Sequence, residues 1–231
     1  TVGEVEVVVP SDATEGVSFD DLFELADIQR IQDQFADATG VASIITRPDG
    51  TPITSTSNFC RLCNIIRQTE KGRRNCFHSD AMLGRCSNTG PIVQPCLSGG
   101  LWDAGAAIHV GGKHVANWLI GQVRDSTQSE DTVLEYARAI GANETDLLEA
   151  FREVPAMSRS QFDQIAQLLY AIASQLSAMA YQNVQQARFI ADRQRAEKEL
   201  RQHRDHLEEL IRERTAELLA KNAELAADIA Q

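Results

Sequence analysis

The sequence lacks the features that mark membrane proteins and secreted, disulfide-rich proteins. No run of about 18 apolar residues occurs in its 231 residues, so we expect no membrane span. No charged and then apolar leader stands at its start, and the five cysteines are too few for a disulfide-dense scaffold. These absences predict a cytoplasmic protein whose thiols stay reduced, and we expect it to be a fragment of a longer protein.

Motifs of common catalytic sites are also missing. The sequence has no GxSxG, P-loop or HExxH pattern. His109 and His114 flank a predicted hairpin turn, where surface residues are more common than catalytic bases. We therefore expect that this chain is not itself an enzyme.

Basic residues are scarce overall but concentrated in one segment. The net charge is −11, which disfavours nucleic-acid or anionic-membrane partners, since both reward basic surfaces. Residues 57–125, however, carry eight basic and four acidic residues, and all five cysteines lie there. This segment is where we expect chemistry.

The cysteine spacing is compatible with a metal centre. Cys60 and Cys63 would lie on one helix face and could both ligate one metal ion, with Cys76 as a third ligand. Cys96 or His78 would be the fourth ligand, and thiolates suit zinc or an iron–sulfur cluster. With only one CxxC pattern present, small buried thiols without a metal are an equal alternative.

The same CxxC pair permits a redox interpretation. Cys60 and Cys63 could exchange between dithiol and disulfide, and basic neighbours such as Arg61 and Arg67 would stabilise a thiolate. Thioredoxin-like enzymes need a βαβ context that this chain does not show. A thiol-based redox switch or oxidoreductase therefore stays open as the alternative function.

Hydrophobic periodicity and turn residues predict a mixed α+β chain. A β-prone segment at 2–9 precedes a helix that begins at Ser18 and closes near Gly40. Two helices are expected at 60–70 and 74–88, with a break at Gly72. The remaining predictions are strands at 41–46, 52–54 and 92–96, a hairpin of 104–110 with 115–123, and helices at 131–139, at 145–150 and from Ser158.

The last third of the chain predicts a very long helix, because residues 160–231 contain neither proline nor glycine. Apolar residues recur there at the spacing of a coiled-coil seam: Leu200, Leu207, Ile211, Leu218, Leu225 and Ile229. We expect a parallel homodimeric stalk. A solvated charged helix is the alternative, and a pure dimerisation scaffold is a third, weaker interpretation of the whole chain.

A small-ligand pocket is expected where the hairpin begins. An aromatic and an acid stand beside glycines at Trp102 and Asp103, and Trp118 and Gln122 sit on the second hairpin strand. Aromatic and polar groups of this kind commonly line small-ligand pockets. A core tryptophan with a turn aspartate explains the same pattern equally well.

Several separated motifs resemble the PocR-type sensory domain, a PAS-like ligand-binding module. The resemblance runs from about Ser18 to about Ala180. The motifs that carry it are Leu25-Ala26-Asp27-Ile28-Gln29, Thr39-Gly40, Asp49-Gly50, Phe59-Cys60, Gly72-Arg73, Cys76, Ser79-Asp80, Cys96, Gly100-Leu101, Asp103 and Gly121-Gln122-Val123. This resemblance implies an antiparallel PAS-like sheet flanked by helices, with the long helix after it.

The resemblance also implies a function. Similar domains are sensor inputs of bacterial and archaeal signalling proteins, proposed to bind short diols and other hydrocarbon derivatives. The three-cysteine pattern of the family corresponds to Cys60, Cys76 and Cys96, whereas Cys63 and Cys86 are additional. The stalk around Leu207 resembles connectors that precede histidine kinase domains. We therefore expect an arm at 1–17, a sensory domain at 18–183 and a stalk at 184–231 that leads to a kinase domain.

Overall fold

The computed structural model describes residues 18–87 and 89–229, and side chains as far as residue 223. The β-prone segment predicted at 2–9 lies outside the described residues. The chain divides into two compact units, Thr1–Gln182 and Asn183–Gln231.

The first unit is built on a four-stranded sheet in the order β1-β4-β3-β2, in which every neighbouring pair is antiparallel. The strands are β1 (Ala42–Thr46), β2 (Ile92–Pro95), β3 (Trp102–Val110) and β4 (Lys113–Val123). The predicted β3–β4 hairpin is confirmed. Its turn uses Gly111 and Gly112, which both have positive φ, as tight hairpin turns require.

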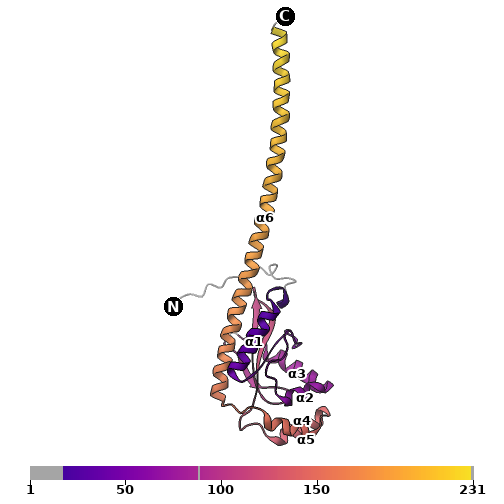
Figure 1. Ribbon diagram of the computed structural model, residues 1–231, viewed down its shortest axis with the longest axis vertical. Helices are drawn as coiled ribbons and strands as arrows, with labels where there is room; N and C mark the ends of the chain where they lie inside the picture. Colours follow the sequence, from indigo (N-terminus) through magenta and orange to yellow (C-terminus); the bar gives the residue numbers. More distant parts are fainter. Residues whose placement is uncertain (1–17, 88, 230–231) are drawn as a thin grey trace. The chain divides into compact units, whose positions relative to one another are not determined.

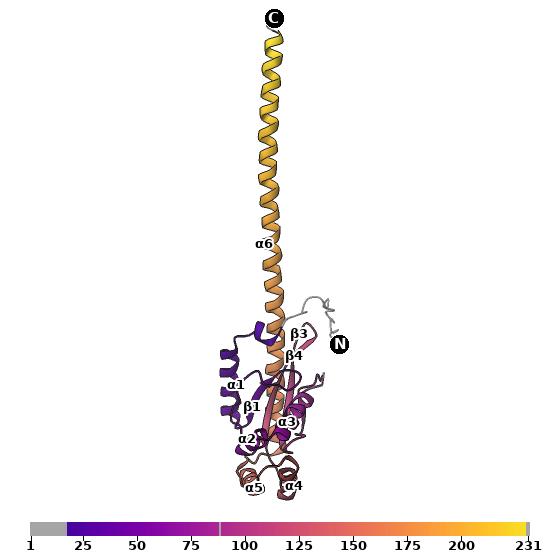
Figure 2. The ribbon, with the colours of Figure 1, turned by 90° about the vertical axis from the view of Figure 1, so that its right-hand side faces the viewer.

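Helices cover both faces of this sheet (Figures 1 and 2). One face carries α1 (Leu25–Thr39) and the first turns of α6 (Arg159–Ile229), and Phe35 of α1 packs on Trp118 with ring centroids 5.8 Å apart. The other face carries α2 (Arg61–Gln68) and α3 (Glu70–Leu83). Helices α4 (Glu130–Ile140) and α5 (Glu144–Glu153) share a hydrophobic core with α2.

The break between α2 and α3 is not at Gly72, as predicted, but at Thr69. Thr69 has extended backbone, and its hydroxyl caps α3 by accepting the Gly72 N–H at 3.0 Å. Gly72 is needed for packing, since a Cβ there would overlap the Ile66 carbonyl. The helix also ends earlier than expected, at Leu83.

Two other local predictions were wrong. Ser18 caps only a single 3-10 turn, Phe19–Asp21, through reciprocal bonds with Asp21, and α1 begins separately at Leu25. Residues 52–54 form no regular strand, because Pro52 makes only an isolated bridge to Thr46.

The long C-terminal helix is confirmed as α6, and with it the predicted α+β fold class. Its seam residues Leu200, Leu207, Ile211 and Leu218 are 57–71% exposed in the single chain, and the side chains of Leu225 and Ile229 are outside the described residues. Within the described part of the chain, no helix has both the length and the apolar character needed to cross a membrane.

Candidate ligand-binding site

A cavity lies between the sheet and the helices α2 and α3. It contains about 460 Å³ of empty space, counting its open mouth. A water molecule can be centred in only about 30 Å³ of this space. The space that a water molecule can reach is small, so the cavity suits only a molecule of a few non-hydrogen atoms. Apolar side chains form part of its wall, and its polar groups come from Arg67, Ser79, Asp80, Ser98, Asp103 and Gln122.

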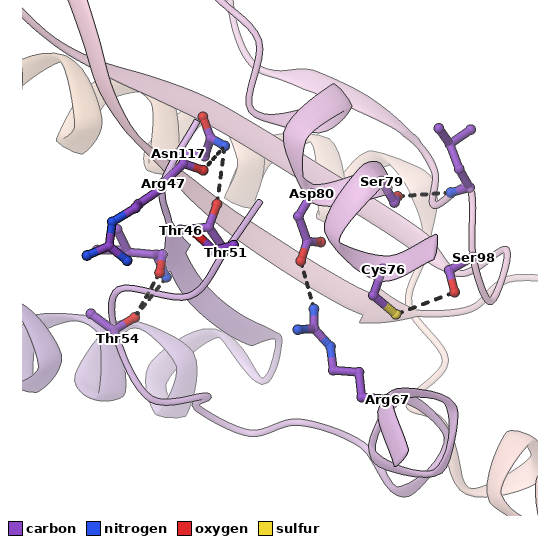
Figure 3. Close-up of polar contacts among 12 residues, drawn as sticks. Thr46, Arg47, Thr51, Thr54, Arg67, Cys76, Ser79, Asp80, Ser98 and Asn117 are labelled. Carbon is purple, nitrogen blue, oxygen red and sulfur yellow. Dashed lines mark hydrogen bonds and ion pairs between the residues drawn. The ribbon is translucent and has the colours of Figure 1, made fainter. Parts of the chain in front are cut away.

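An ion pair joins the two helices at the cavity wall. The guanidinium of Arg67 on α2 donates to the Asp80 carboxylate on α3 at 2.8 Å (Figure 3), and the two side chains are only 18% and 10% exposed. The guanidinium also lies 5.0 Å from the centroid of the Phe59 ring. Burial raises the pKa of Asp80 to about 6, although the charge and the hydrogen bond of Arg67 oppose this shift.

One donor of Arg67 has no partner. Its Nε atom is buried and makes no hydrogen bond within the described residues. An unsatisfied buried donor costs about 1–3 kcal/mol, more for a charged group. Because Arg67 lines the cavity, an oxygen atom of a bound molecule would supply the missing acceptor.

A β-bulge positions a second carboxyl group in the cavity. The β3–β4 register passes from Trp102 opposite Val123 to Asp103 opposite Gly121, so Gln122 is an extra residue, with φ of +60°. Its N–H, freed from the ladder, donates to Asp103 Oδ1 at 2.8 Å. The carboxylate lies directly over Gly121, where a Cβ would overlap it.

Burial raises the pKa of Asp103 to about 7. The Gln122 N–H lowers it, the charges of Asp80 and Cys60 raise it, and Arg67 has a smaller lowering effect. Two carboxyl groups therefore share a cavity with one guanidinium, which pairs with Asp80 and not with Asp103.

Three thiols line the same cavity, those of Cys63, Cys76 and Cys96. The hydrogen bond with Cys60, followed by burial, raises the pKa of Cys63 well above its usual value. Burial likewise raises the pKa of Cys76 and of Cys96. These three thiols are therefore protonated at neutral pH.

Cys60 differs from the other three. It stands at the N-cap of α2, and the hydrogen bond from Cys63 lowers its pKa. Its backbone N–H donates to Gln122 Oε1 at 2.8 Å, which ties the CxxC segment to the bulge. Among the residues that the structure describes, no three His, Cys, Asp or Glu side chains are grouped so that they could hold a metal ion. The predicted four-cysteine ligand set is therefore not assembled in this arrangement.

Cys86 and His78 lie outside this lining. Cys86 is exposed after α3, with its Sγ 2.8 Å from His109 Nε2, and His78 is exposed on α3. His109 and His114 are partly buried beside the β3–β4 turn, with their ring centroids 5.4 Å apart.

The structure brings two of the four predicted pocket residues into the cavity, Asp103 and Gln122. Trp118 is fully buried on the opposite face of the sheet, where its indole donates to Ser43. Trp102 also lies outside the lining, because successive residues of a strand point to opposite faces. With regular alternation along β4, the side chain of Gln122 would also point away from the cavity. The bulge instead places it on the cavity side of the sheet.

Sequence reasoning missed four polar residues of the cavity: Arg67 on α2, Ser79 and Asp80 on α3, and Ser98 in the turn after β2. A signal existed for two of them, since Arg67 is among the basic residues near the cysteines and Asp80 belongs to a family motif. Their pairing depends on how α2 and α3 pack, which spacing does not reveal.

Comparison with known protein families gives a match over most of the chain. The family model described as the sensory domain found in PocR matches residues 21–181, which include every residue of the cavity. The chain belongs to this family. The predicted resemblance to the PocR-type sensory domain is thus confirmed, and residues 21–181 form a sensory domain.

One curated relative of this PocR-type chain is the regulatory protein PocR of Salmonella typhimurium, 31% identical over 148 residues. The match covers 63% of this chain and 48% of that protein, so the chain spans about half the length of its relative. No solved structure matches the chain.

Proposed function

We propose that residues 18–183 bind a small organic molecule, such as a short diol or a related hydrocarbon derivative, in the cavity between the sheet and α2 and α3. The observation that carries this proposal concerns Arg67, whose side chain lines the cavity and whose buried Nε has no partner within the described residues. A ligand oxygen would accept from it and recover the cost of burying it.

The lining of the cavity favours a molecule with both polar and apolar parts. Ile44, Phe59 and Leu119 offer apolar contacts, and Arg67 and Asp103 offer polar ones. Apolar walls with a few polar groups are typical of small-molecule sites. A short, partly hydroxylated carbon chain matches both kinds of surface.

Occupation of the cavity would be relayed through α6 to an output domain, which we propose is a histidine kinase. The stalk at 184–231 would pair with a second copy in parallel, since its seam side chains Leu200, Leu207, Ile211 and Leu218 are exposed in one chain. The word "regulatory" in the name of the Salmonella relative agrees with an output function.

Calorimetric titration with propane-1,2-diol, glycerol and propan-1-ol tests the proposal. The variant Arg67→Lys keeps a cation for Asp80 but removes the Nε donor, and should weaken binding about 10- to 100-fold, the value of one hydrogen bond to a charged group. Arg61→Lys is the matched control, because Arg61 pairs with Glu153 at the surface and does not line the cavity. Unchanged affinity in Arg67→Lys would contradict the proposal.

A second candidate function, a thiol redox switch, is favoured by the lowered pKa of Cys60 beside the buried Cys63. Cys60 would attack an oxidising disulfide, and Cys63 would then displace the bound thiol to close a Cys60–Cys63 disulfide. Incubation with glutathione disulfide followed by peptide mass mapping should find this bond, and Cys60→Ser should abolish it. A mixed disulfide that persists at Cys60 would rule the switch out.

Ligation of zinc or an iron–sulfur cluster by Cys60, Cys63, Cys76 and Cys96 stays a prediction. The lining of one cavity by three of these thiols supports it, although their side chains would have to move together. Native mass spectrometry of anaerobically purified protein, before and after Cys76→Ala, measures bound metal directly. Metal-free protein with five freely titrating thiols would refute this prediction.

A further inference from the structure

The geometry points to a ligand with a protonated amine at one end and an oxygen at the other, a small amino alcohol, whose ammonium pairs with Asp103. This inference rests on the proposed function, because it names the chemical class of ligand for the same cavity.

The charges around the cavity are not balanced. Arg67 pairs with Asp80, and no other Lys, Arg or His side chain lines the cavity. Asp103 receives one hydrogen bond, from the Gln122 N–H to Oδ1, and no basic side chain pairs with it among the described residues. Its second oxygen, Oδ2, is left for a ligand.

The remaining groups near Asp103 do not supply the missing positive charge. Those that act on it electrostatically are Asp80 from α3, Cys60 before α2, and the already paired Arg67. Asp103 in turn acts on the neighbouring thiols of Cys63, Cys76 and Cys96. Every one of these groups except Arg67 is either neutral or negative at neutral pH.

Asp103 is partly buried, and a carboxylate in such a place without a cation is unfavourable, because its desolvation is not offset by an attractive charge. An ammonium group would donate a charge-assisted hydrogen bond to Oδ2, which is roughly twice as strong as a neutral one. A neutral diol would leave the Asp103 carboxylate without a cation. The amine is therefore the ligand group that Asp103 selects.

The other end of the ligand is set by Arg67. Its buried Nε needs an acceptor, and a hydroxyl oxygen provides one without adding charge. A carboxylate would bring a second negative charge beside Asp80, which already neutralises the guanidinium. An amino alcohol of a few non-hydrogen atoms satisfies both anchors within the small cavity.

Three probes of nearly equal size separate the possibilities: 1-aminopropan-2-ol, propane-1,2-diol and lactate. Calorimetric titrations are made with the full chain at a pH above about 7, where both the amine and Asp103 are charged. We expect the amino alcohol to bind at least about tenfold more tightly than the diol, and lactate to bind most weakly.

The variant Asp103→Asn keeps the shape of the side chain and an acceptor for the Gln122 N–H. It should remove the preference for the amine over the diol, because the negative charge is lost. Asp131→Asn, an exposed position on α4, is the matched control and should keep the preference. Thermal unfolding of each variant verifies that it is folded.

Each outcome has a distinct meaning. Tighter binding of the diol or of lactate, or an amine preference that survives Asp103→Asn, would overturn this inference while the proposed function stands. Failure of all three probes, together with the alcohols tested above, would overturn the proposed function itself.

Discussion

The guanidinium carbon of Arg159 lies 4.0 Å from the centroid of the Trp102 ring. Trp102 immediately precedes Asp103 of the cavity, and Arg159 is the first residue of α6. The indole is also held by Asp125, which accepts from Nε1 at 2.9 Å. One short segment of β3 thus contacts the candidate site on one face of the sheet and the start of the long helix on the other.

Replacement of Trp102 by Leu should loosen the start of α6. A cation–π contact of about 0.5–2 kcal/mol corresponds to a roughly 2- to 30-fold rise in local opening. Hydrogen exchange measured by mass spectrometry should show faster exchange in peptides that begin at residue 159. Arg159→Gln should have a similar effect, whereas Arg193→Gln, which breaks an exposed pair with Glu197, should not change these peptides. Equal exchange in all three variants would contradict this relationship.

The buried ion pair should make Asp80→Asn strongly destabilising. The substitution leaves the Arg67 guanidinium without its carboxylate in a site where both side chains are mostly buried. Removal of one member of such a pair costs about 3–5 kcal/mol. Urea unfolding measures the change in the free energy of unfolding. The control Asp27→Asn breaks the exposed pair with Arg30 and should change stability by less than about 1 kcal/mol.

The carboxyl group of Asp103 should make the sensory domain less stable as the pH rises. Its folded pKa of about 7 lies above its usual value of 3.8, so the folded state holds the proton that the unfolded state releases. Its contribution to stability is present below about pH 4 and is lost as the pH rises through about 7.

The measurement is the difference in melting temperature between wild type and Asp103→Asn from about pH 5 to pH 8. Burial lowers the pKa of His109, which has the opposite effect on stability with pH, but this contribution cancels in the comparison. We expect the melting temperature of wild type to fall relative to that of the variant across this range. A rise in the melting temperature of wild type relative to that of the variant would contradict the raised pKa of Asp103.

Cys86 should be the first of the five cysteines to react with iodoacetamide. It is exposed and its Sγ lies beside His109 Nε2, whereas Cys63 and Cys76 are buried with raised pKa values. Cys60 should react second, since its pKa is lowered but its side chain is half-buried. Peptide mass mapping over time gives this order, and His109→Gln should slow Cys86 while the exposed control His78→Gln should not.

The proposed pairing of two stalks should be lost when the seam carries a charge. Leu207→Lys introduces a charge at a proposed seam position that is 57% exposed in the single chain. Sedimentation velocity of the variant should show a shift from dimer to monomer. Leu219→Lys is the matched control, because Leu219 is 66% exposed but stands outside the heptad pattern. Dissociation by both variants, or by neither, would argue against the proposed seam.

Features that depend on neighbouring residues were predicted well. The absence of Pro and Gly after residue 159 predicted α6, and alternation with Gly111-Gly112 predicted the β3–β4 hairpin. The predicted helix break at Gly72 was wrong, because interactions with neighbouring residues can offset the low helix propensity of a glycine. Here Thr69 caps the helix and Gly72 packs closely inside it.

The sequence by itself determined the family and the fold class, and it indicated the segment that supplies most of the candidate cavity, since these follow from periodicity, turn residues and motifs in order. Tertiary structure decided which side chains meet. Alternation along β3 separates Trp102 from Asp103, and a single bulge residue directs Gln122 into the cavity. The pairing of Arg67 with Asp80 depends on the packing of α2 against α3. These contacts join residues distant along the chain, and only the folded chain brings them together.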